Sequence, residues 1–145
     1  MSSVLFKYDD GGRAAAGFRG KTGDCVTRAI AIATRLPYRD VYDTLNLFGE
    51  QERLSKRRRR KSNARTGVHK VTTRRFMEKL GWTWTPCMGI GTGCRVHLRA
   101  DELPSSRLVL ALSRHSAAMI DGVLHDTHDC SRAGTRCVYG YWRAP

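Results

Sequence analysis

The fold of this chain is decided by one stretch, Thr22-Gly23-Asp24-Cys25-Val26-Thr27-Arg28-Ala29-Ile30-Ala31-Ile32-Ala33. Its first three residues are typical of a loop, and the residues that follow are apolar nearly all round. This pattern predicts a buried central helix over about Cys25 to Thr34. We expect Asp24 to cap the helix, because its carboxylate can accept hydrogen bonds from free amides in the first turn.

Cys25 carries the most distinctive chemistry of this stretch. At the start of a helix a thiol lies at the positive end of the helix dipole, which lowers its pKa and favours the nucleophilic thiolate. Downstream, His115 begins a strand-like run and is our predicted base. A thiolate at a helix start paired with a histidine on a strand is the arrangement of a cysteine hydrolase. The alternative is that Cys25 is a small buried hydrophobe.

The remaining pattern predicts one α+β domain over residues 1–145, with helices first and an antiparallel sheet second. Residues 1–22 are expected to form an extended arm. A second helix is predicted from Pro37 to Phe48, and a third from Thr72 to Gly81 with Phe76 and Leu80 as its inner face. The predicted strands run over residues 82–85, 108–112, 116–120, 123–127 and 137–142.

The pair Asp121-Gly122 between two apolar runs is a strong signal for a two-residue hairpin loop. This loop would set His115 opposite His128 and put Asp126 on the same face. A carboxylate there can hold the histidine ring and its tautomer. We therefore predict Cys25 as nucleophile, His115 as general base and later general acid, and Asp126 as the orienting acid. His128 takes the place of His115 if the register slips, and Asp126 has the alternative of pairing with an arginine.

An oxyanion formed in such a reaction needs hydrogen-bond donors. The backbone amide of Cys25, which a helix start leaves free, is one predicted donor. The second is expected just upstream, where Arg19 and Lys21 are the candidates.

The order of these motifs resembles papain-like cysteine peptidases: Gly23-Asp24-Cys25 opens a buried helix, His115 opens a strand, and a polar residue follows on the next strand. The closer likeness is to compact bacterial members, the bacteriocin-processing and NlpC-type cell-wall peptidases. The stretches Gly23 to Leu45 and Arg114 to Thr127 also resemble phage and bacterial proteins of this superfamily.

The resemblance implies a papain-like fold and a thiolate that attacks an amide or thioester carbonyl of a peptide or protein substrate, without a cofactor. Water or an amine would then resolve the acyl-enzyme. One position departs from the family, since papain-like enzymes often carry a glutamine six residues before the cysteine and Arg19 stands there. A papain-like scaffold whose site has decayed is therefore a further hypothesis.

A second functional hypothesis comes from the charge of the chain. The formal net charge is +13, and eight of the basic residues, with no acidic ones, lie between Arg53 and Arg65. We predict an exposed basic loop at about residues 50–66 in which nothing is buried. Such a loop suits a polyanionic partner, either nucleic acid or an acidic protein. The residues expected to bind are Arg57, Arg58, Arg59, Arg60 and Lys61.

Four further cysteines form two pairs in the sequence, Cys87 with Cys94 and Cys130 with Cys137, each with six residues between. Four thiolates can make a zinc site, but ligand pairs in structural zinc sites usually have two to four residues between them. We therefore expect no metal site and reduced thiols, in keeping with an odd cysteine count.

No apolar stretch approaches the roughly 20 residues of a membrane span, and the N-terminus lacks the apolar core of a signal peptide. We expect a cytoplasmic protein, where thiols stay reduced. That cytoplasm would be bacterial, or a host's if the chain is encoded by a phage.

Overall fold

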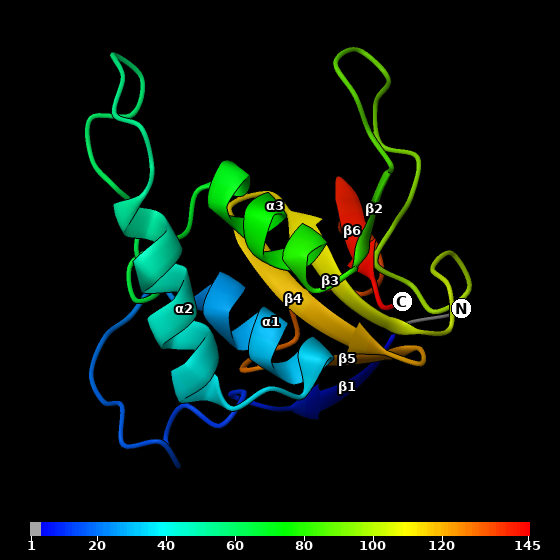
Figure 1. Cartoon of the computed structure of the whole chain (residues 1–145). Helices are drawn as coiled ribbons and strands as arrows, with labels where there is room; N and C mark the ends of the chain where they lie inside the picture. Colours follow the sequence, from blue (N-terminus) through cyan, green and yellow to red (C-terminus); the bar gives the residue numbers. More distant parts are fainter. Residues whose placement is uncertain (1–3) are drawn as a thin grey trace.

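The computed structural model describes residues 4–145, and within them the chain is an α+β fold of three helices and one six-stranded mixed sheet (Figure 1). The first three residues of the predicted N-terminal arm lie outside the described residues. The elements in chain order are β1 (Leu5–Tyr8), α1 (Cys25–Thr34), α2 (Tyr38–Glu50), α3 (Lys70–Lys79), β2 (Thr83–Pro86), β3 (Arg107–Leu112), β4 (His115–Ile120), β5 (Val123–Asp126) and β6 (Gly140–Arg143).

The strand order in the sheet is β1-β5-β4-β3-β6-β2, and every neighbouring pair is antiparallel except β1 with β5. The prediction of a purely antiparallel sheet, with residues 1–22 only an arm, is therefore wrong. All four residues of β1 are exposed, so this edge strand carries no alternating apolar pattern to reveal it. It pairs through its backbone, with Leu5 beside Val123 and Tyr8 beside Asp126.

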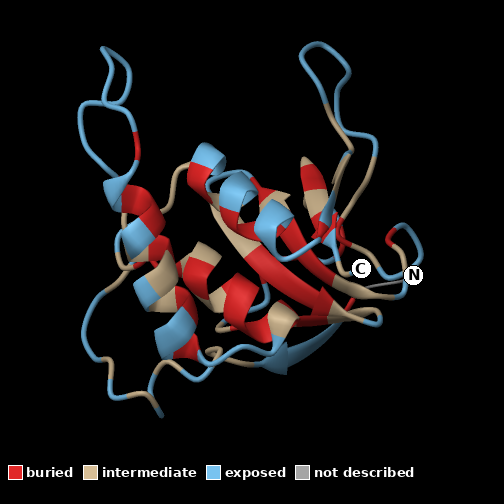
Figure 2. Cartoon of the chain, viewed as in Figure 1, coloured by how far each residue is buried: buried red, intermediate tan, exposed pale blue. Residues whose placement is uncertain are grey.

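The helices and the loops cover opposite faces of the sheet. One core cluster joins the buried faces of the three helices to Val109, Ala118 and Trp142. The other joins Leu108, Leu110 and Met119 to apolar residues of the loops around them. Figure 2 shows the buried residues gathered in the sheet and on the sides of the helices that face it. Helix α1 has the predicted bounds, and six of its residues are buried.

The inner face of α3 differs from the prediction. Phe76 is buried as expected, but Leu80 is 37% exposed and its place in the core is taken by Met77, which is fully buried. The helix begins at Lys70 and ends at Lys79, so Leu80 lies beyond its last turn. The bounds of α2 differ less, since it starts directly after Pro37 and extends two residues past Phe48.

The predicted basic loop is only partly exposed. Residues 53–61 are exposed and project from the body of the protein (Figures 1 and 2), but Ser62 and Ala64 are buried, which the sequence analysis excluded. The cause is Glu52, whose buried carboxylate accepts hydrogen bonds from the amide and hydroxyl of Ser62 and from the hydroxyl of Thr72. These bonds close the loop at its base and bring the chain back into the core.

The thiols are not all reduced, because Cys94 and Cys137 form a disulfide with a Cα–Cα distance of 5.7 Å. The expectation of five reduced thiols is wrong for this pair. Cys25, Cys87 and Cys130 are free. The bonded residues are 43 positions apart, so the pairing depends on tertiary structure and the sequence spacing gives no sign of it.

Among the helices of the described residues, none combines the length and the apolar character that crossing a membrane requires.

Gly49 in α2 lies against the returning chain at Ser62, and we predict that Gly49→Ala lowers the free energy of unfolding by about 1–3 kcal/mol. Alanine is favoured over glycine in a helix by about 1 kcal/mol. The added Cβ, however, would lie closer than 3.0 Å to the carbonyl oxygen of Ser62, which is backbone and cannot swing away. Urea unfolding gives the difference.

The control is Gly89→Ala, where the nearest atom to a new Cβ is the end of Thr92 at 3.7 Å. We expect this variant to unfold as the parent does. Equal stability of the Gly49 and Gly89 variants would contradict the close approach of α2 to Ser62.

Candidate active site

Cys25, His115 and Asp126 come together where the start of α1 meets β4 and β5. The His115 Nε2 lies 2.7 Å from Oδ2 of Asp126. Because a carboxylate only accepts hydrogen bonds, Nε2 of His115 is the donor. His115 and the amide of Ser116 lie close enough to Cys25 to lower the pKa of its thiol. The structure thus brings the three predicted residues together, while their catalytic role stays a prediction.

The hairpin that carries His115 and Asp126 has the predicted register. Asp121 and Gly122 both have positive φ, 47° and 83°, as a type I′ turn requires. Three cross-strand pairs follow with Ile120 opposite Val123, and the ring of His128 lies 5.3 Å from that of His115. The turn chemistry therefore decides which side chains share the site.

Electrostatics favours a thiolate–imidazolium pair. Burial of Cys25 opposes its ionisation, but the hydrogen bond with His115 and the charges of His115 and Arg28 outweigh burial and lower the pKa of the thiol. Burial also opposes a charged His115, yet hydrogen bonds with Asp126, Cys130 and Cys25 raise its pKa to about 11. At a pH between the pKa of the Cys25 thiol and that of His115, the thiol is ionised and the imidazole is protonated.

Asp126 stays ionised for the same reasons. Burial raises the pKa of its carboxyl group, but hydrogen bonds from His115 and from the amide of Thr127 outweigh burial, and the net shift is downward. Its side chain is only 3% exposed. A buried, ionised carboxylate of this kind orients the imidazole and stabilises its charged form.

Arg28 is a site residue that the sequence analysis missed. It lies one turn into α1, pairs with Asp24, and places Nη2 3.6 Å from Oδ1 of Asp126. Arg28 thus joins two buried carboxylates across the start of the helix. Two signals point to it in hindsight: it is the one charged residue of an apolar helix, and it stands four positions after Asp24.

The predicted capping role of Asp24 is wrong. Its side chain makes no capping hydrogen bond to α1. Its carboxylate instead accepts a hydrogen bond from the hydroxyl of Tyr38 and pairs with Arg28 and Arg13. The neighbouring cations compete for the carboxylate more strongly than the neutral amides of the first turn.

The start of α1 is held by the segment that returns from the basic loop. The amide of Gly23 and the hydroxyl of Thr22 donate to the carbonyl of Arg65, and the hydroxyl of Thr27 donates to that of Ala64. A Cβ on Gly23 would meet the carbonyl of Thr66 at 3.0 Å, so the two backbones approach closely there. The position of Cys25 therefore depends on residues 64–66.

Arg19 and Lys21, the predicted oxyanion donors, have exposed side chains. Their carbonyl oxygens accept hydrogen bonds from the guanidinium of Arg65, at 2.8 and 3.0 Å. These bonds fix the backbone before Cys25 and leave the two side chains in solvent. The role of either residue as an oxyanion donor stays a prediction.

Cys130 is a second thiol beside the pair, and the sequence analysis did not place it there. It is 3% exposed, and its sulfur lies beside His115 and Asp126. The ligand atoms of these three side chains lie within 4.8 Å of one another, close enough to hold a metal ion. In the predicted triad, however, His115 interacts with Cys25 and Asp126 orients His115. We therefore interpret Cys130 as a neighbour that supports this pair.

Comparison of the chain with protein-family models, with curated proteins and with solved structures found no match. The geometry of the site therefore carries the functional argument.

Proposed function

We propose that this protein is a papain-like cysteine hydrolase, a peptidase or amidase that acts on a peptide or protein substrate. The observation that carries the proposal is the contact of Cys25 at a helix start with His115, and of His115 with buried Asp126. The order of helix, strand and strand along the chain, and the α+β fold around them, support a papain-like arrangement.

The proposed reaction uses each side chain in turn. The Cys25 thiolate attacks the carbonyl carbon of an amide or thioester, and the negative charge on the oxygen is met by the free amide at the start of α1. His115 gives its proton to the leaving group as the acyl-enzyme forms. It then takes a proton from water, or from an amine, which attacks the acyl carbon and releases Cys25.

Labelling with a thiol-directed electrophilic probe tests the proposal. At pH 6 we expect the probe to label Cys25 faster than Cys87 by at least tenfold, because burial raises the pKa of the Cys87 thiol whereas that of Cys25 is lowered. Peptide mapping by mass spectrometry identifies the labelled residue. Cys25→Ser should remove the label and Cys87→Ser should keep it. Labelling of Cys87 in preference to Cys25 would refute the proposal.

A second proposed function, binding of a polyanion by the basic loop on an inactive papain-like scaffold, also has a structural observation behind it. Residues 57–61 are all basic and all exposed. A hollow at the foot of the loop is lined by Arg53, Arg58 and Arg75, and a second by Arg60, Lys61 and His69. Several cations around one hollow suit phosphate or carboxylate groups.

Replacing Arg57, Arg58, Arg59 and Arg60 by alanine tests this second function. With a short duplex DNA as probe, we expect weaker binding and a smaller slope in a plot of log K against the log of the salt concentration. The slope should fall in magnitude by about 3–4, because each lost phosphate contact contributes roughly 0.9. Fluorescence anisotropy at several salt concentrations measures both. The control removes the same charge at four scattered exposed positions, Lys7, Arg95, Arg132 and Arg143. An equal effect of the two sets would show that net charge, and not the loop, binds DNA.

A further inference from the structure

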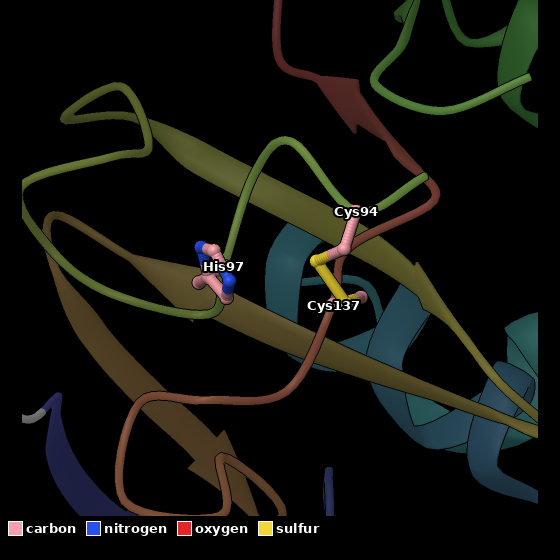
Figure 3. Close-up of side chains that lie close together, drawn as sticks. All are labelled: Cys94, His97 and Cys137. Atoms are coloured by element: carbon pink, nitrogen blue, oxygen red, sulfur yellow. A yellow bond between two sulfur atoms is a disulfide. The ribbon is translucent and has the colours of Figure 1, made fainter. Parts of the chain in front are cut away.

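Three metal-ligating side chains gather far from Cys25 in the sequence, at Cys94, His97 and Cys137 (Figure 3). Their ligand atoms lie within 4.8 Å of one another. Cys94 is exposed, and the other two side chains are half-buried. The proposed hydrolase uses none of these residues.

Backbone pairing holds the group together. His97 and Cys137 face each other in an isolated antiparallel bridge. The amide of Leu98 donates to the carbonyl of Arg136 and the amide of Val138 to that of Val96, both at 2.8 Å. Hydrogen bonds therefore fix the distance between the two segments whether or not the sulfur atoms are bonded to each other.

Glu102 hydrogen bonds with His97 and selects its tautomer. Its Oε1 accepts hydrogen bonds from the amide of His97 at 3.0 Å and from Nδ1 at 3.1 Å. A carboxylate on Nδ1 places the proton there and leaves Nε2 with a free lone pair. Metal-binding histidines in proteins are oriented in this way, with a carboxylate on the nitrogen that does not bind the ion.

We propose that Cys94, His97 and Cys137 bind a zinc ion when the Cys94–Cys137 disulfide is reduced. Two thiolates and one imidazole are ligands that zinc prefers, and a water molecule completes the tetrahedron. Cys94 and His97 have two residues between them, which is a spacing common in zinc sites. The expectation of no zinc site was based on the six residues between Cys87 and Cys94. In the fold, Cys94 lies beside Cys137 instead.

The chemistry of the exchange balances with a dithiol as reductant. The dithiol gives two electrons and two protons to the disulfide, whose S–S bond breaks, and is itself oxidised to a disulfide. The two thiols then release their protons as zinc binds. Zinc–sulfur bonds of about 2.3 Å hold two thiolates about 3.8 Å apart in a tetrahedron, so a modest opening of the sulfur atoms admits the ion. The same two segments are crosslinked in both states.

Cobalt titration tests the proposal, because tetrahedral cobalt with thiolate ligands absorbs in the visible and zinc displaces it. For the folded chain reduced with dithiothreitol and then freed of it, we expect one cobalt ion per chain. The oxidised chain should bind none. His97→Ala and Glu102→Gln keep both cysteines, and each should weaken binding by about 10–100-fold.

The control distinguishes this group from the second one found among residues 4–145, which consists of His115, Asp126 and Cys130. We expect Cys130→Ser to retain the cobalt spectrum and Cys94→Ser to lose it. Loss in Cys130→Ser, or equal binding by the oxidised chain, would overturn the proposal. Because the test reads only metal binding, it is independent of whether Cys25 proves catalytic.

Discussion

His115→Ala should slow the alkylation of Cys25 by iodoacetamide at pH 6 by about tenfold. Without the imidazolium, the thiol returns toward its ordinary pKa near 8.5, and about 0.3% is ionised at pH 6. The loss is partly offset, because a thiolate of higher pKa is the stronger nucleophile, with a Brønsted coefficient of about 0.4–0.5. Peptide mapping of the alkylated protein at a series of times gives the rate.

The same reasoning predicts that the effect changes sign with pH. Near pH 10 both proteins hold Cys25 largely as thiolate, and the variant, with the more basic sulfur, should react at least as fast as the parent. His125→Ala is the control, since His125 pairs with Asp9 instead of Cys25. If Cys25 of the His115→Ala variant is alkylated more slowly than that of the parent by the same factor at every pH, the cause is a change in access to Cys25. That result would contradict an ion pair.

Arg28→Met should lower the free energy of unfolding by about 2–3 kcal/mol. The loss is smaller than the roughly 3–5 kcal/mol of a buried charge left unpaired, because Asp24 keeps Arg13 and Tyr38 as partners and Asp126 keeps His115. The side chain of Arg28 is 12% exposed and lies between Asp24 and Asp126, whose side chains are 0% and 3% exposed. Methionine fills much of the same volume and removes the charge, so the loss comes mainly from the two carboxylates. Urea unfolding at pH 7 measures it.

Arg74→Met is a matched control for this prediction. Arg74 also pairs with an acidic residue four positions away, Glu78, but the two side chains are 49% and 55% exposed. Exposed pairs contribute about 0–1 kcal/mol, and we expect the variant to lose no more than that. Similar losses for Arg28→Met and Arg74→Met would contradict the account of Arg28 as the bridge between two buried carboxylates.

Local patterns in the sequence were enough to predict α1 and the hairpin of β4 and β5. An apolar run after Asp24 has few options other than a buried helix, and Asp121-Gly122 determines both turn type and register. Since His115 and Asp126 lie on that hairpin, their contact could be predicted as well. Their approach to Cys25 depends on packing of α1 on the sheet, which the sequence supported only through the resemblance.

Features that depend on distant contacts were beyond the sequence. Strand β1 joins the sheet by backbone pairing, with exposed side chains that carry no pattern. The Cys94–Cys137 bond and the position of Cys130 depend on how loops cross the face of the sheet opposite the helices. Asp24 was predicted to cap the helix because the fold was needed to show that Arg13 and Arg28 pair with its carboxylate.

The central claim, an ion pair of the Cys25 thiolate with His115, is tested most directly by titrating the thiolate itself. Ultraviolet thiolate absorbance of the parent minus that of Cys25→Ser, with the Cys94–Cys137 disulfide intact in both, follows Cys25 alone as pH rises. We predict a midpoint below the ordinary value near 8.5, because the interaction with His115 lowers the pKa of the thiol. A midpoint at 8.5 or above would show that burial prevails at this sulfur and would contradict the account.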